Sequence, residues 1–142
     1  MGQLLSGLPN AIGDNEELAR YLKSSSQYNS HGVKGSAFMP NPVDNSTSVF
    51  RQGAEPQDEL WELGLKEAVG ARTLYGAAIV SASDVVGAGL IVKADEPPTK
   101  HAVIFGWPIQ SADKDLEKAK HKEIALRIAS CAILILRSSL TN

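Results

Sequence analysis

The residue whose type and position best suit catalysis is His101. It leads residues 102–105, an AVIF run that is too short for a helix and rich in β-branched and aromatic side chains, which predicts a buried strand. Pro97 and Pro98 end whatever precedes this strand, since neither has a backbone N–H to donate. Because imidazole titrates near neutral pH, a histidine at the end of a rigid core strand can act as a general acid or base.

Arg51 and Tyr75 are the two side chains that could assist such a histidine. Arg51 closes one predicted strand and Arg72 precedes another, and the guanidinium of a strand-end arginine can hold a phosphate or a carboxylate through a fork of donors. Tyr75 lies in another predicted strand. Brought together, His101, Arg51 and Tyr75 would suit phosphodiester chemistry in a small metal-independent hydrolase or a toxin-like ribonuclease.

A structural interpretation of the same residues is open as well. His101 would then bond to neighbouring backbone at the strand end, and Arg51 would pair with surface acids such as Glu55 and Asp58. One histidine without a base partner or a nucleophile is not a complete catalytic site. The sequence therefore does not decide whether the chain is an enzyme.

Motifs for metals, cofactors and nucleotides are missing from the sequence. The three histidines, His31, His101 and His121, are not spaced as a metal-binding pair, and there is no H-E-x-x-H, C-x-x-C, G-x-S-x-G, P-loop or G-x-G-x-x-G. We therefore expect no metal and no cofactor.

The charge pattern argues against a nucleic-acid partner. Fourteen basic and 16 acidic residues give a net charge of −2, whereas dedicated nucleic-acid binders are strongly basic. The basic stripe Lys114, Lys118, His121 and Lys122 is interleaved with acids, which is typical of a solvated, ion-paired helix face.

Length and composition predict one cytoplasmic domain over residues 1–142. Hydrophobic residues make up 43 % of the 142 residues, enough for one sizeable core. The single cysteine, Cys131, cannot form an internal disulfide and is expected to be a small buried residue in a helix. No apolar run approaches the roughly 20 residues of a membrane span. Met1 to Ser6 matches the N-myristoylation pattern, but no polybasic segment follows to complete an anchor.

The first half of the chain is predicted to alternate between short helices and strands. Residues 1–13 read as a loose lead-in, and Leu18, Tyr21 and Leu22 give the apolar stripe of a helix from Asp14 to about Ser24. Strands over 33–39 and 47–51 could form a wide hairpin. The remaining predicted elements are a turn at 52–57, a helix at 58–68, a strand at 73–82, a single turn at 85–86 and a strand at 90–93.

A long terminal helix is predicted from Asp113 to about Ser138, since no glycine or proline interrupts it. Between Arg127 and Leu136 the residues are apolar on nearly all sides of such a helix, so this half should pack on the sheet or on a second copy of the chain. The element order predicts an α+β fold. We expect a mostly antiparallel sheet of about five strands packed against the terminal helix, with two shorter helices.

Three runs resemble a group of small bacterial proteins for which no activity is known. They are AFMPNP at 37–42, SVFR at 48–51 and GLIVKADEPPTKHAVIFGWP at 89–108. The resemblance implies a bacterial or phage cytoplasmic setting, and it carries no catalytic residue.

These observations favour a protein-interaction or oligomeric module. In this interpretation the apolar C-terminal helix contacts a second copy or another protein of a multi-gene bacterial system. The alternative is the hydrolase or ribonuclease built on His101 and Arg51. A third interpretation is a small-ligand binding module that uses the same mouth of the sheet.

Overall fold

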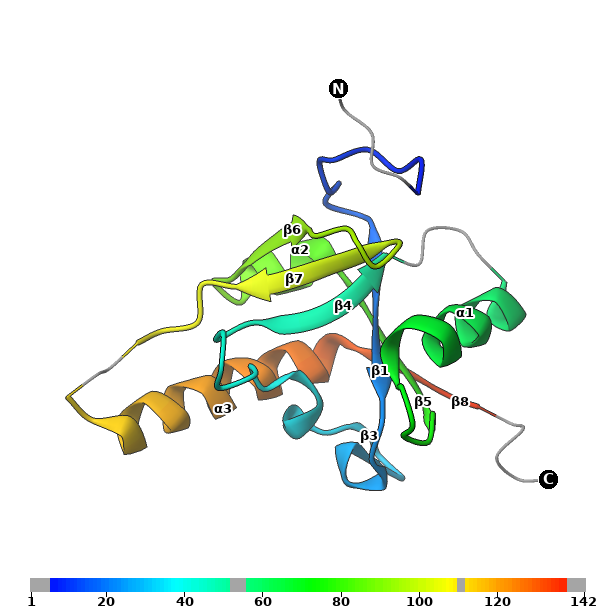
Figure 1. The fold of residues 1–142 in the computed structure, drawn as a ribbon. Helices are drawn as coiled ribbons and strands as arrows, with labels where there is room; N and C mark the ends of the chain where they lie inside the picture. The colour runs from blue at the N-terminus through cyan, green and yellow to red at the C-terminus, as the bar shows by residue number, and fades with distance from the viewer. Residues whose placement is uncertain (1–5, 52–55, 110–111, 138–142) are drawn as a thin grey trace.

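The structure, a computed structural model, describes residues 6–51, 56–109 and 112–137. Among these residues, six strands form one antiparallel sheet (Figure 1). The strands are β1 (Glu17–Leu22), β4 (Thr47–Arg51), β5 (Gly76–Ser81), β6 (Ile91–Ala94), β7 (His101–Phe105) and β8 (Ile133–Leu136). Their order across the sheet is β6-β7-β4-β1-β5-β8, so β6 and β8 are the edges. A separate two-stranded ribbon joins β2 (Tyr28–Asn29) to β3 (Gly32–Val33).

Helices cover both faces of the sheet. One face packs against α1 (Gln57–Leu63) and the π-helical turn η3 (Gly64–Ala68), through a core that includes Tyr21, Phe50 and Leu60. The other face packs against α2 (Ala82–Gly87), the 3-10 helix η2 (Gly35–Phe38) and α3 (Lys114–Cys131). A second short 3-10 helix, η1 (Ser25–Gln27), precedes β2. In Figure 1, α1 and α3 lie on opposite sides of β1.

The predicted α+β class is confirmed: a mostly antiparallel sheet combines with a long C-terminal helix and two shorter ones. The strands β4, β5, β6 and β7 form where they were predicted, and α1 with η3 covers the predicted helix at 58–68. The strand β7 lies inside the sheet, between β6 and β4.

The predicted helix from Asp14 to Ser24 is wrong, because this segment forms β1 and pairs with both β4 and β5. Leu18 and Leu22 enter one core, whereas Ala19 and Tyr21 enter the other. A strand that is buried on both faces loses the usual alternation of polar and apolar residues. Within so short a segment, its apolar positions cannot be distinguished from a helical stripe.

The predicted strand at 33–39 is also wrong. Only Val33 of that segment is in a strand, and residues 35–38 form η2, whose Ala37 and Phe38 are fully buried. The wide hairpin with 47–51 does not form, because β4 pairs with β1 and β7. Gly35 allows this packing, since a Cβ at that position would lie 3.2 Å from backbone atoms of Leu126 in α3.

The terminal helix ends at Cys131 rather than near Ser138. Ala132 is extended, and the apolar residues that follow form β8, which pairs with β5. Gly76 of β5 makes this pairing possible, because a Cβ there would collide with the carbonyl oxygen of Ile135. Cys131 is exposed, so its predicted burial in a helix core is wrong.

Some predictions fall outside the described residues. They are most of the lipidation pattern at Met1 to Ser6 and most of the turn at 52–57. No helix among the described residues is long and apolar enough to cross a membrane.

Candidate functional site

His101 is held at the start of β7 by the residues around it. Its Nδ1 lies 3.0 Å from the carbonyl oxygen of Asp95 and 3.2 Å from the Oδ2 atom of the same residue. The ring stands edge-on to Phe50, with 5.2 Å between the ring centroids, and the side chain is 12 % exposed. The imidazole is therefore anchored on one nitrogen and retains a partly accessible edge.

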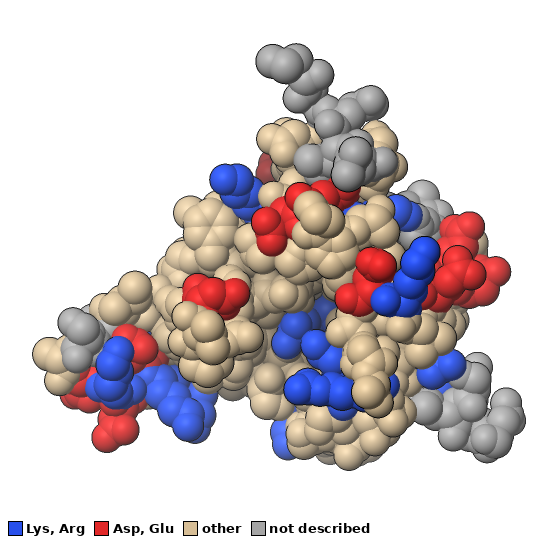
Figure 2. Space-filling view, in the orientation of Figure 1, with Lys and Arg blue, Asp and Glu red and all other residues tan. Residues whose placement is uncertain are grey.

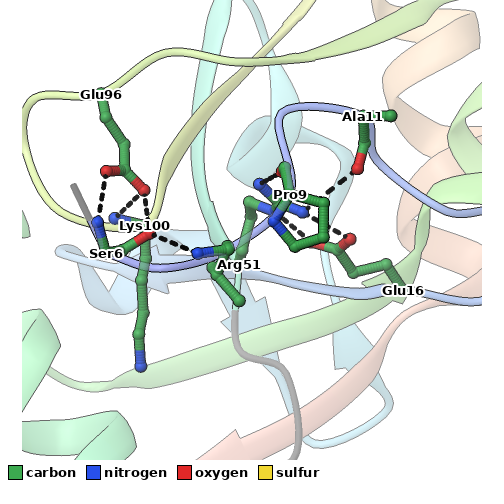
Figure 3. Close-up of polar contacts among 8 residues, drawn as sticks. Ser6, Pro9, Ala11, Glu16, Arg51, Glu96 and Lys100 are labelled. Carbon is green, nitrogen blue, oxygen red and sulfur yellow. Dashed lines mark hydrogen bonds and ion pairs between the residues drawn. The ribbon is translucent and has the colours of Figure 1, made fainter. Parts of the chain in front are cut away.

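Arg51 is buried, and its guanidinium is surrounded by hydrogen-bond acceptors of the protein itself (Figure 3). Its Nε and Nη2 atoms pair with the carboxylate of Glu16, and Nη2 lies 2.9 Å from Oε1. Nη1 donates to the carbonyl oxygen of Pro9 at 2.6 Å, and Nη2 also reaches that of Ala11 at 3.4 Å. Because its fork is directed at these groups and the residue is only 1 % exposed, Arg51 ties residues 9–16 to the sheet.

The structure does not bring His101, Arg51 and Tyr75 together. His101 lies directly opposite Phe50, and successive residues of a strand point to opposite faces, so Arg51 projects from the other face. Tyr75 packs against Tyr28, with 6.2 Å between ring centroids, near the end of β1 that lies farthest from the pairing of β1 with β4.

A cleft opens where β1 and β4 separate. The two strands pair only through Leu18 with Arg51 and Ala19 with Phe50. Arg20 follows this short ladder and bridges the gap: its Nε donates to the carbonyl oxygen of Ala37 at 2.8 Å, and its Nη1 donates to that of Ser48 at 2.9 Å.

Two hollows meet at this gap, with volumes of about 240 Å³ and about 510 Å³. They share Arg20, Lys23, Ser48 and Ala68 as lining residues, so they form one elongated cleft. We call it the β1–β4 cleft. His101 lines its smaller end, and Arg72 lines its larger end.

The β1–β4 cleft is positively charged. Arg20, Lys23 and Arg72 all line it, and none of the three makes an ion pair with a described carboxylate. Burial lowers the pKa of Arg20 to about 10, which leaves the group charged at neutral pH. Burial also lowers the pKa of Lys23, and the positive charges of Arg20 and Arg72 lower it further. Figure 2 shows Lys and Arg side chains around a hollow in the region where Figure 1 draws β1, β3 and β4.

Acidic side chains also reach the walls of the cleft. Glu67 lines the smaller end and Asp44 the larger end. Neither forms an ion pair with the three cations, so these two carboxylates offset the positive charge of the cleft only in part. Among all the residues that the structure describes, no group of three or more His, Cys, Asp or Glu side chains could hold a metal ion.

Comparison with known proteins leaves the site to be interpreted from its own chemistry. No protein-family model, curated protein or solved structure matches the chain. This result agrees with the resemblance to a group of proteins without known activity, and it transfers no site residue.

Of the residues that line the cleft, the sequence pointed to His101 and to Arg72, a strand-end arginine that can bind a phosphate or a carboxylate. It missed Arg20 and Lys23. Arg20 gave a signal that could have been used, because it stands alone as a charged residue inside the apolar run LARYL. Once that run is recognised as a strand buried on both faces, an arginine in its middle is the exception that requires an explanation. Lys23 gave no such signal, and only the fold brings Arg72 to Arg20.

Proposed function

We propose that the chain binds an anionic ligand, bearing a phosphate or carboxylate group, in the β1–β4 cleft. One observation supports this proposal above the others: Arg20, Lys23 and Arg72 line a single cleft without an ion pair to any described carboxylate. Like charges in one site repel one another, and a bound anion removes that repulsion.

The geometry of Arg20 makes it the expected centre of binding. Two backbone carbonyls fix its guanidinium, and a guanidinium carries five N–H donors in a rigid fork. Because the group is already ordered, little side-chain entropy is lost when a ligand arrives. A planar fork of this kind matches the oxygens of a phosphate or a carboxylate.

The other lining residues favour a ligand that has more than one polar group. Gln27, Asn41 and Ser46 line the larger end and offer neutral donors and acceptors. Tyr21 and Phe50 line the smaller end, where an apolar or ring-shaped part of a ligand can pack. The proposal concerns binding and assigns no reaction, and Arg51 has no part in it.

Binding can be tested with pyrophosphate as the probe, by isothermal titration calorimetry at low ionic strength. We expect saturable binding to the natural chain and at least about tenfold weaker binding to Arg72→Gln. Arg72 is exposed, so its replacement should leave the fold intact. The matched control is Arg127→Gln, which removes the same charge from an exposed position on α3 and should bind like the natural chain. Equal affinities of all three proteins, or no saturable heat, would contradict the proposal.

We also propose that the protein works in a bacterial cytoplasm. The support is the implied bacterial setting and a lone cysteine, Cys131, which is exposed and has no cysteine partner in the chain. In freshly lysed bacteria that express the gene, the Cys131 thiol should react fully with a maleimide. A thiol that is already oxidised would contradict this setting.

A further inference from the structure

We propose that two copies of the chain associate by antiparallel pairing of their β8 strands, which joins two six-stranded sheets into one. The apolar end of the chain suggested self-association from sequence alone, but through a helix. The structure shows that this segment is instead an edge strand, paired with β5 on one side. Among the described residues, no strand pairs with its other side.

The backbone of β8 has donors and acceptors on its open side. The N–H of Arg137 donates to the carbonyl oxygen of Tyr75 at 3.0 Å. This bond shows which residues of β8 direct their N–H and C=O groups toward β5. In an antiparallel pair, alternate residues exchange their bonds with the same neighbour. Ile133 and Ile135 therefore direct their N–H and C=O groups at β5, whereas Leu134 and Leu136 direct theirs away from the sheet.

The side chains of β8 include none of the residue types that usually prevent a further strand from pairing at an edge. Ile133 is 64 % exposed and Leu136 is 51 % exposed, and the strand contains no charge and no proline. Natural edge strands are usually protected by charged residues or proline, or by a covering helix or loop. The strand β3 lies near β8 but does not pair with it. The opposite edge shows one of these devices, since Lys93 lies in the middle of β6.

A second copy is the occupant that fits this edge best. Under a two-fold axis, an antiparallel strand is its own complement. With Ile135 on that axis, Leu134 lies opposite Leu136 of the partner subunit, and the two residues exchange both bonds. The symmetric pair doubles this to four hydrogen bonds across the axis. In this register the apolar side chains of β8 continue across the axis on both faces of the joined sheet.

The size of the interface determines how strong the association is. A four-residue ladder buries less area than the 1,200–2,000 Å², roughly, of specific stable interfaces. We therefore expect a dimer that dissociates on dilution rather than a permanent one. Because β1 and β4 lie inside the sheet, pairing at β8 leaves the β1–β4 cleft open, and the two proposals are independent.

The test is sedimentation velocity over the widest accessible range of protein concentration. The natural chain should shift from the mass of one chain to the mass of two. In Leu136→Lys the midpoint of this shift should move to at least about tenfold higher concentration, because a lysine on the edge opposes pairing. The matched control is Ile91→Lys, at a 52 % exposed position on β6, and it should dimerise like the natural chain.

Two further measurements separate edge pairing from other causes. Circular dichroism checks that each variant is folded, and Ile133→Lys provides a second edge variant if Leu136→Lys is not. Hydrogen exchange should show the amides of Leu134 and Leu136 protected at high concentration and unprotected at low concentration. A natural chain that stays monomeric throughout, folded edge variants that dimerise normally, or equal loss in Ile91→Lys would overturn the proposal.

Discussion

Arg51 and Arg20 lie on neighbouring strands of one sheet, and their surroundings differ in a way that separates structure from function. Arg51 is 1 % exposed, and its charge is balanced by the carboxylate of Glu16. Arg20 bonds only to backbone carbonyls, and the charged groups that shift the pKa of its neighbour Lys23 are cations. Both arginines are ordered by hydrogen bonds, but of the two only Arg51 forms an ion pair with a described carboxylate.

This difference shows that the presence of an ion pair, rather than burial alone, indicates whether an arginine is available to bind a ligand. A buried charge without a partner is costly, and the buried guanidinium of Arg51 is paired with the carboxylate of Glu16. Arg20 is half-buried and lines the β1–β4 cleft, so its charge can remain available to a ligand. The chemistry expected of Arg51 from sequence is therefore better assigned to Arg20.

The largest expected effect is the loss of the compensated arginine. Arg51→Met removes the fork that holds Glu16, Pro9 and Ala11, and it leaves the carboxylate of Glu16 only 18 % exposed and unpaired. We expect the free energy of unfolding to fall by about 3–5 kcal/mol, measured by urea denaturation. Arg20→Met should cost clearly less, about 1–2 kcal/mol, since it removes two bonds to carbonyls and no buried pair. Equal losses in the two variants would remove the distinction between the arginines.

A smaller effect should follow when only the counter-charge is removed. Glu16→Gln keeps the size of the side chain and one acceptor oxygen, but it replaces the second acceptor with an amide NH2 and leaves Arg51 without its ion pair. We expect unfolding to become easier by about 1–3 kcal/mol in urea, because the buried guanidinium then lacks its partner. Glu17→Gln is the matched control, as it removes an exposed carboxylate from the next residue. If both substitutions have the same effect, the ion pair adds nothing to stability.

The converse experiment gives Arg20 the counter-charge that it lacks. Ser48 is exposed, lines the β1–β4 cleft and accepts a bond from Arg20 through its carbonyl oxygen. In Ser48→Asp the new carboxylate can pair with the cations, so pyrophosphate should bind at least about tenfold more weakly in calorimetry. Ser48→Asn has the same shape without the charge and should bind nearly as the natural chain does. Unchanged affinity in Ser48→Asp would show that the cations do not form the binding site.

The smallest expected effect is a pH dependence near Arg51. Partial burial opposes ionisation of Glu96 and by itself would raise its pKa. Its carboxylate, however, accepts hydrogen bonds from the side chain and backbone of Ser6 and from the N–H of Lys100 (Figure 3). Together with the charge of Arg51, these bonds lower the pKa of Glu96 below 4.5. A carboxyl whose pKa is lower in the folded state stabilises the fold above its unfolded value, and that contribution is lost as pH falls through the folded value.

The natural chain should therefore be slightly more stable than Glu96→Gln at neutral pH, by less than about 1 kcal/mol. The difference should shrink as pH falls below the unfolded pKa of 4.5 and vanish below the folded pKa, which is lower still. Urea denaturation of both proteins at the two pH values measures it. A difference that grows in acid would mean that the hydrogen bonds from Ser6 do not favour the ionised form.

The sequence by itself determined the class of the fold and most of its local elements. Proline and glycine delimit β7, β-branched residues identify β4 and β5, and an uninterrupted run without glycine or proline predicts most of α3. It could not identify β1, because a strand buried on both faces has no polar alternation. Nor could it end α3 at Cys131, since residues 133–136 become a strand only by pairing with β5 beside Gly76.

Tertiary structure alone decided the site. The register of β4 against β7 put His101 and Arg51 on opposite faces, and a single residue of register would have reversed this. The separation of β1 from β4 after two residue pairs opened the cleft. The fold also brings Arg72 to Arg20 and Lys23, which lie about 50 residues earlier in the chain. Such long-range placement depends on strand pairing and packing between distant segments, which local sequence patterns do not encode.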